Sequence, residues 1–214
     1  MDERLKDAIE AGDRDAVAAL LEEEPGLAGE RHGVLSAVML AAYHKQPRIA
    51  GTLLKVRGPA DLFEAAALGL SDRVRELVSE DPRAVAARSP DGFTSLHLAA
   101  YFGGADTVRF LLEKGSDIDS VAENTSKVRP LHSGVAGGSF DVVEALLEAG
   151  AEHDVRQEGG FTPLMGAAVG GSAEMVRALL SAGADPSALT DDGQSALDLA
   201  RTNHHAHLDE LLGD

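Results

Sequence analysis

The stretch "TSLHLAAYFGGADTVRFLLEKG" (94–115) decides the fold, because its pattern recurs along the chain. "RPLHSGVAGGSFDVVEALLEAG" (129–150) and "TPLMGAAVGGSAEMVRALLSAG" (162–183) repeat its leucine, small pair, glycine, Leu-Leu pair and closing glycine. Weaker copies precede and follow these three. The units are anchored at Leu5, Val38, Leu62, Leu96, Leu131, Leu164 and Leu197. A recurring period near 33 residues is typical of a repeat architecture.

Each unit predicts two short antiparallel helices joined by a turn. Thr94 and Thr162 stand at N-cap positions, and Pro163 follows at the first helical position. Glycines are placed to end the first helix (Gly12, Gly69, Gly103, Gly138, Gly171) and, as left-handed caps, the second (Gly115, Gly150, Gly183). Helices this short are unstable alone, so the units must stack. We predict an all-α solenoid of about seven helix-turn-helix units in one domain, 1–214, with capping units first and last.

The repeated motif resembles the T-P-L-H-x-A-A signature of the ankyrin repeat. It is present as Thr94-Ser95-Leu96-His97-Leu98-Ala99-Ala100, and with departures in Arg129-Pro130-Leu131-His132 and Thr162-Pro163-Leu164-Met165. The resemblance covers essentially the whole chain. It implies an ankyrin-repeat solenoid with short β-turn fingers between units, and protein binding as the chief role of such arrays. The layout is similar to that of many bacterial ankyrin-repeat proteins, which suggests a bacterial source.

Two units depart from the common length. The second is short, with 24 residues from Val38 to Leu62, and leaves little room for a finger. We expect the array to bend or flatten there. The fourth carries two extra residues in "DSVAENTSKVRP", so its finger is expected to project further.

Composition narrows the function classes. The net charge is −17, which disfavours a nucleic-acid binder, since that class usually carries a basic footprint. There is no cysteine, and the longest mostly apolar run, 33–43, is shorter than the ~20 residues that span a bilayer. The N-terminal stretch lacks the apolar core of a signal peptide. We expect a cytosolic monomer that binds neither nucleic acid nor membrane.

The resemblance implies a partner surface. In ankyrin repeats the two positions after the Ala-Ala pair lie on the concave, variable face, and the residue two before the turn position that precedes the conserved leucine lies on the finger. At the two positions after the Ala-Ala pair, units two to four carry bulky side chains and units five and six carry small ones. Two of the fingers carry phenylalanine. The predicted partner-binding residues are therefore Tyr43, His44, Leu68, Phe93, Tyr101, Phe102 and Phe161. The alternative is that Tyr101 and Phe102 fill space left by small neighbours.

Basic residues add a second element to this surface. Lys127 and Arg129 flank the long finger, and Arg83 and Arg88 precede the opening stretch. They predict a local site for an anion or an acidic peptide, and we include Lys127 and Arg129 in the partner-binding set. Solvated loop charges are the alternative.

The histidines are the main candidates for catalytic or metal-binding residues. His97 and His132 hold the family's histidine position, where the resemblance implies bonding to backbone of a neighbouring unit. His204 and His207 could share a helix face and bind a metal, but no carboxylate completes the set. Phosphate loops, calcium loops and a nucleophile with its base are not recognisable. We predict no catalytic residue, no cofactor and no metal site.

The sequence therefore favours a protein-binding scaffold or regulator that is not an enzyme. The alternative is a small-ligand binder, or an enzyme, with a pocket between Tyr101/Phe102 and Gly137. A designed sequence without a native partner is a third possibility, and the irregular unit lengths argue against it.

Overall fold

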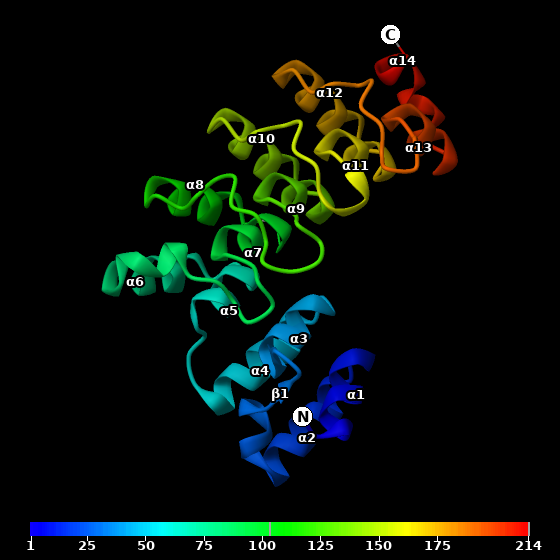
Figure 1. The fold of residues 1–214 in the computed structure, drawn as a ribbon. Coiled ribbons are helices and arrows are strands. Elements are labelled where there is room, and N and C mark those ends of the chain that lie inside the picture. The colour runs from blue at the N-terminus through cyan, green and yellow to red at the C-terminus, as the bar shows by residue number, and fades with distance from the viewer. Residues whose placement is uncertain (103, 214) are drawn as a thin grey trace.

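Seven consecutive helix pairs build the chain, as the repeat predicts. The structure is a computed structural model that describes residues 1–102 and 104–213, so the turn residue Gly103 lies outside the described part. The first helices of the pairs are α1 (Glu3–Ala11), α3 (Ala37–Tyr43), α5 (Leu62–Ala67), α7 (Ser95–Phe102), α9 (Pro130–Gly137), α11 (Pro163–Val169) and α13 (Ala196–Thr202). The second helices are α2 (Arg14–Glu23), α4 (Pro47–Arg57), α6 (Ser71–Glu80), α8 (Ala105–Glu113), α10 (Phe140–Glu148), α12 (Ala173–Ala182) and α14 (Asp209–Leu212). This is the predicted all-α ankyrin solenoid (Figure 1).

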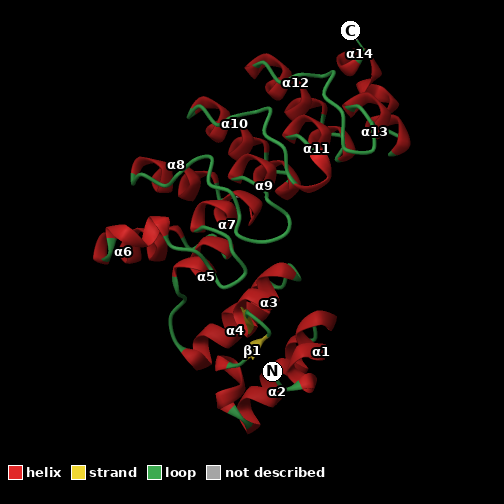
Figure 2. Cartoon of the chain, in the orientation of Figure 1, coloured by secondary structure: helices red, strands yellow, loops and turns green. Residues whose placement is uncertain are grey.

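Very little β-structure accompanies the helices. In the described residues β1 (Arg31–His32) and β2 (Leu35–Ser36) form one antiparallel hairpin, with Arg31 opposite Ser36. Short 3₁₀ turns occupy Pro25–Gly29, Pro82–Ala86, Glu158–Gly160 and Ala206–Leu208. The remaining connections are loops, several of which form the fingers between units (Figure 2).

In the six units other than the fourth, the turn after the first helix contains a residue with positive φ. Glycine holds this place in α1, α5, α9 and α11, and its left-handed backbone suits the sharp turn into the second helix. Lys45 (φ 56°) and His204 (φ 64°) hold the same place after α3 and α13. A side chain in this conformation is strained, so these two units fold despite a local cost.

We predict that His204→Gly raises the free energy of unfolding by about 1 kcal/mol, because glycine removes the left-handed strain. His204 is exposed, so little packing is lost. Gly138→Ala is the matched opposite change, since nothing lies within 4 Å of the added Cβ and φ is 77°. It should lower the free energy by a similar amount. Urea unfolding of both variants measures this, and a destabilised His204→Gly protein would contradict it.

Consecutive fingers are tied by single backbone hydrogen bonds. Glu123 N donates to Gly92 O (2.9 Å), Glu158 N to Ser126 O (3.0 Å) and Asp191 N to Gly159 O (3.0 Å). The equivalent position in the finger before α7 is Pro90, which has no N–H to donate. The connection before it, Gly58–Asp61, is too short to form a finger. The first finger of the series therefore has proline at the position where an N–H would otherwise be left without a partner.

The short second unit divides the core. One hydrophobic cluster is built by α1 to α4, with Leu5, Ile9 and Leu53 at its centre, and the other extends from α5 to the C-terminal pair and takes in Met39 and Ala42 of α3. The line of first helices, followed from α13 to α5, changes direction at α3 (Figure 1). The expected bend thus lies at the short unit.

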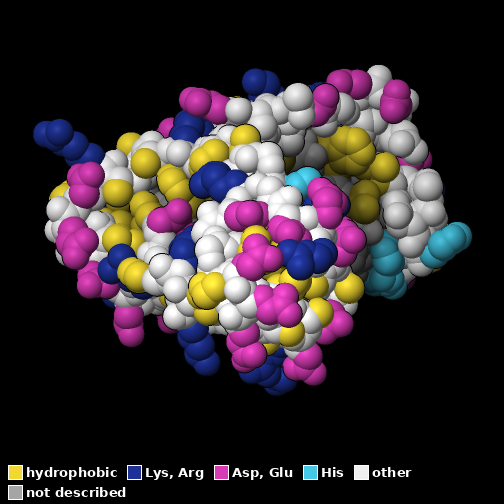
Figure 3. All heavy atoms as spheres, turned by 90° about the horizontal axis from the view of Figure 1, so that it is seen from below, with side chains coloured by type: hydrophobic (Ala, Val, Ile, Leu, Met, Phe, Trp, Pro, Cys, Tyr) yellow, Lys and Arg dark blue, Asp and Glu magenta, His cyan; other side chains and the backbone are white. Residues whose placement is uncertain are grey.

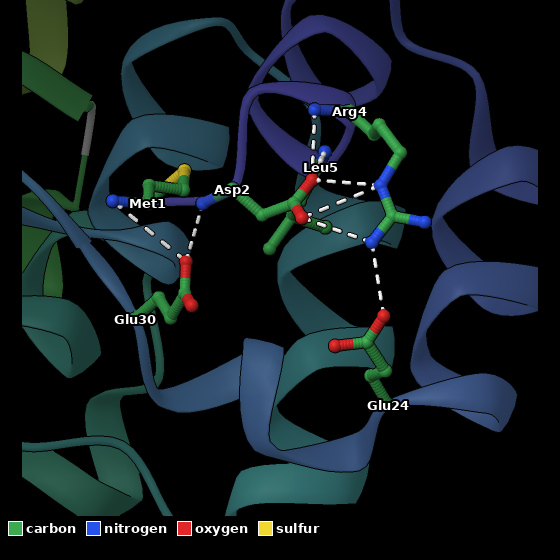
Figure 4. A network of polar contacts seen from close by, with 6 residues as sticks. All are labelled: Met1, Asp2, Arg4, Leu5, Glu24 and Glu30. Carbon is green, nitrogen blue, oxygen red and sulfur yellow. Dashed lines mark hydrogen bonds and ion pairs between the residues drawn. The ribbon is translucent and has the colours of Figure 1, made fainter.

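At the N-terminal end, polar contacts hold the first pair together. Asp2 caps α1 and accepts hydrogen bonds from Arg4 and Leu5, while the Arg4 guanidinium also reaches Glu24 at 2.9 Å (Figure 4). The start of α1 is thereby linked to the end of α2.

A buried carboxylate joins the two parts of the core. Glu64, in the first turn of α5, is 1% exposed. Arg57 at the end of α4 donates to both of its oxygens (2.7 and 2.6 Å), and Ser36 Oγ and Asp61 N also donate to it. Burial alone would raise the pKa of Glu64, and these hydrogen bonds outweigh it, so the pKa is lowered.

We predict that Glu64→Gln lowers the free energy of unfolding by about 3 kcal/mol at pH 7, because Arg57 keeps its charge and loses its partner. Since the folded-state pKa of Glu64 lies below the unfolded one, the stabilisation is complete above the unfolded pKa and is lost as pH falls through the folded pKa. Denaturation of the variant should lack this acid-dependent component.

The matched control replaces both partners, Arg57→Met with Glu64→Leu, and should be less destabilised than Glu64→Gln. Equal losses in the single and double variants would contradict this role of the ion pair.

Candidate partner-binding surface

A groove with few charged residues runs along the first helices of units three to six. Three adjoining hollows of about 550, 360 and 330 Å³ compose it. Tyr101 and Ala136 belong to both the first and the second, and His132, Ala136 and Gln157 to both the second and the third. Hydrophobic side chains lie recessed in a hollow at the right of Figure 3, with charged side chains on the surrounding surface. The hollows therefore form one continuous surface.

Aromatic residues line one end of this groove. The rings of Tyr101 and Phe102 meet edge to face at 5.0 Å, and Phe102 lies 5.6 Å from Tyr43. Tyr101 is 36% exposed, whereas Phe102 and Tyr43 are half-buried. The ring of Tyr101 is thus exposed to solvent, while Phe102 packs against the core as the space-filling alternative expects.

Tyr43 reaches over a whole unit. Its hydroxyl donates to Asp91 at 2.7 Å, in the finger before α7, although α5 lies between α3 and α7 in the chain. Two features allow this: α5 offers only Ala65, Ala66 and Ala67 along this stretch, and the finger before α5 is absent. Burial and the Asp91 carboxylate raise the pKa of Tyr43. Tyr43 therefore links α3 to the finger before α7 and also lines the groove.

A glycine sets the depth of the hollow beside Tyr101. A Cβ added to Gly137 would overlap the carbonyl oxygen of Tyr101. This close backbone approach of α9 to α7 is possible only without a side chain. The aromatic wall and the glycine-lined hollow that the sequence suggested do lie side by side.

The remaining predicted residues are distributed over the groove and its surroundings. Leu68, Phe93 and Phe161 line the first, second and third hollows respectively. His44 is exposed at the end of α3, outside the three linings. Lys127 is exposed between Ser126 and Val128, which line the second hollow, and has a positive φ of 54° where other fingers have glycine.

The guanidinium groups near the long finger are engaged with acids. Arg129 lies 2.6 Å from Glu152 and 3.8 Å from Asp119, and Arg88 lies 2.9 Å from Glu123. These contacts compensate two of the four charges that the anion-site prediction relied on, those of Arg88 and Arg129. Sequence reasoning could not see them, because the partner acids come from neighbouring units.

Groove residues that sequence reasoning missed include Lys45, Ser126, Ser133 and Gln157. Lys45 follows His44 directly in the turn after α3. Aligning the turns by their expected left-handed residue would have placed it beside the groove.

His97 and His132 have the structural role that the resemblance implied. They are 1% and 5% exposed, and their Nε2 atoms lie 3.1 Å from Val128 O and 3.3 Å from Phe161 O. Each links a first helix to the finger that follows. Burial lowers the pKa of both to about 4, so both are neutral at pH 7.

We predict that His97 and His132 make the fold sensitive to mild acid. Below pH ~6.5 the two histidines take up protons in the unfolded chain, whereas the buried rings of the folded chain stay neutral down to about pH 4. Their contribution to the free energy of unfolding is therefore complete above pH ~6.5 and falls toward pH 4. Each adds up to about 1.4 kcal/mol per pH unit to the slope. Unfolding at pH 5 and 7 should show a shallower slope for His97→Gln/His132→Gln than for the unaltered chain. An unchanged slope would rule this out.

The histidines near the C-terminus do not assemble the helix-face pair considered for a metal. His204 lies in the left-handed turn after α13 and not in a helix. The Nε2 atoms of His205 and His207 each lie 3.0 Å from a carbonyl oxygen, of Val169 and Gly171. In residues 1–102 and 104–213 no three histidine, aspartate or glutamate side chains are grouped to hold a metal ion.

Comparison with known families agrees with this architecture. The family model for ankyrin repeats (three copies) matches residues 62–157 and 131–214, which together exceed half of the chain. The chain therefore belongs to the ankyrin-repeat family. Residues 1–61 lie outside the two matched segments.

Curated relatives match this chain over part of its length. The chain is 33% identical over 102 residues to mouse ankyrin repeat and SAM domain-containing protein 6, covering 48% of this chain and 11% of that protein. It is 32% identical over 110 residues to human BCL-6 corepressor-like protein 1 (51% and 6%), and 36% identical over 93 residues to the Notch protein of Drosophila melanogaster (43% and 3%). The matches thus span about half of this chain and a small part of each relative. A bacterial source stays a prediction, since these relatives are animal proteins.

No helix in the described residues is both long and apolar enough to cross a bilayer.

Proposed function

We propose that this chain is a protein-binding scaffold or regulator that acts as one ankyrin-repeat domain and holds a segment of a partner protein in its concave groove. The observation that carries the proposal is the continuous groove, in which Lys45 is the one charged residue of the described lining and the ring of Tyr101 is exposed. Aromatic side chains with a polar tip are common anchors in protein interfaces. Ankyrin repeats generally serve as interaction modules, which supports the same role.

Four further features belong to this proposal. The net charge of −17 argues against nucleic acid as a partner. We propose that the chain is monomeric and cytosolic. We also propose that it has no enzymatic activity.

A small-ligand site is the second candidate, favoured by the size of the middle hollow. Its volume of about 360 Å³ lies within the range of ligand pockets. Its histidines, Tyr43 and Ser126 are already hydrogen-bonded within the chain. The polar side chains of the lining that could orient a ligand are then Tyr101, Ser133 and Gln157. A thermal-shift screen with small molecules tests it.

We predict that Tyr101→Ser weakens partner binding by tenfold or more, because the exposed anchor of the groove is lost. Leu189→Ser is the matched control, since Leu189 is 47% exposed and does not line the groove. Proteins captured by the unaltered chain are purified, and their affinity for both variants is measured by calorimetry. Full binding by a folded Tyr101→Ser protein, or an equal loss in Leu189→Ser, would contradict the proposed site.

A further inference from the structure

Charge is segregated along the chain. Residues 31–60 contain five lysines and arginines and no aspartate or glutamate, although the whole chain carries 19 basic and 36 acidic residues. This segment therefore has a charge of +5 in a protein of net −17, which leaves −22 on the rest. It comprises the β-hairpin, α3 and α4.

Most of these cations are uncompensated. Among the described residues Arg57 is the member of the set with an ion pair, to Glu64, whereas Lys45, Arg48 and Lys55 have none. All three are exposed. Arg48 and Lys55 are seven residues apart on α4 and so share one face, and Lys45 precedes them in the turn. By contrast, Arg73, Arg88, Arg129 and Arg156 on the acidic side each contact a carboxylate.

The basic segment borders the groove. Lys45 lines the largest hollow together with Leu68, Tyr101 and Phe102, and it is the one charged residue among the described residues of that lining. Pro47, the first residue of α4, lines the same hollow. The first turn of α4 has no acidic residue, whereas those of α6, α8, α10 and α12 each have one. The positive end of this helix is thus left without a local counter-charge.

We propose that the groove binds a partner segment in which acidic residues flank apolar anchors. The anchors enter the hollow beside Tyr101 and Leu68, and the acidic side chains meet Lys45 and Arg48. This inference rests on the proposed function and adds the chemistry of the partner to it.

The charge distribution favours a short acidic segment over a long polyanion. Screening confines charge interactions to about 8 Å at physiological salt, so a peptide end held at Lys45 senses mainly the basic unit. A nucleic acid or an anionic membrane would extend over neighbouring units, which carry the excess of negative charge. The uncharged lining also offers apolar contact that a phosphate backbone cannot use.

The test uses the full chain and three sets of synthetic peptides. All share two leucine anchors, and the flanking residues are glutamate, glutamine or lysine. Fluorescence anisotropy is recorded at low and at physiological salt, with single-stranded DNA and phosphatidylserine vesicles as competing probes. We expect the glutamate set to bind most tightly, with an affinity that falls as salt rises.

The decisive variant is Lys45→Gly/Arg48→Gln. It should weaken binding of the glutamate set about tenfold. Glycine at position 45 also relieves the positive φ of 56°, so lost binding in this variant does not arise from unfolding. Arg83→Gln/Arg177→Gln removes the same charge from exposed residues outside the groove and should bind as the unaltered chain does.

Each other outcome overturns the inference in a distinguishable way. Tighter binding of the lysine or glutamine set, lost in Tyr101→Ser, would keep the groove as a partner site and reject the acidic partner. Binding of the glutamate set that Tyr101→Ser leaves intact would reject the groove itself. Preference for DNA or vesicles, or no binding by any peptide set, would also reject the proposed partner chemistry.

Discussion

Burial of each helix pair against the next is the constraint on which this molecule depends. The helices have at most eleven residues, too few to be stable alone in water. Their apolar stripes leave water only when units stack, and the buried leucines Leu96, Leu131 and Leu164 mark these contacts. The groove is a consequence of the same stacking, because its floor is the row of first helices.

The third residue after the N-cap of the first helix links neighbouring units in several of the repeats. The third residue after the N-cap is Glu64, His97, His132, Met165 and Asp198 in units three to seven. His97 and His132 bond to the backbone that precedes the next unit, and Glu64 reaches back to Arg57 and Ser36 instead. The charged pair thus links α5 backwards across the short connection before it, whereas the two histidines link forwards. The same gap lets Tyr43 extend to Asp91, so one short connection alters both the core and the groove.

Much of this could be predicted from the sequence. The leucine anchors, the glycine caps and the short unit follow from spacing and local backbone chemistry. The roles of His97 and His132 follow from the resemblance to the ankyrin repeat. Contacts between units were out of reach: the Arg129–Glu152 pair and the Tyr43–Asp91 bond join residues 23 and 48 positions apart. His204 holds the turn position that glycine holds in most other units, which the sequence alignment of the units already indicates. The excess of basic residues in the second unit is visible in the sequence. Only the structure shows which of these charges have an ion pair and that Lys45 lines the groove.

The central claim, that the row of first helices forms the partner surface, is open to direct mapping. Amide shifts of the isotope-labelled chain would be recorded by NMR while a purified partner is added. The account predicts that the largest changes fall on α7, α9 and the turn at Lys45, with α8, α10 and α12 little affected. Changes concentrated on the exposed faces of α8, α10 and α12 would contradict it.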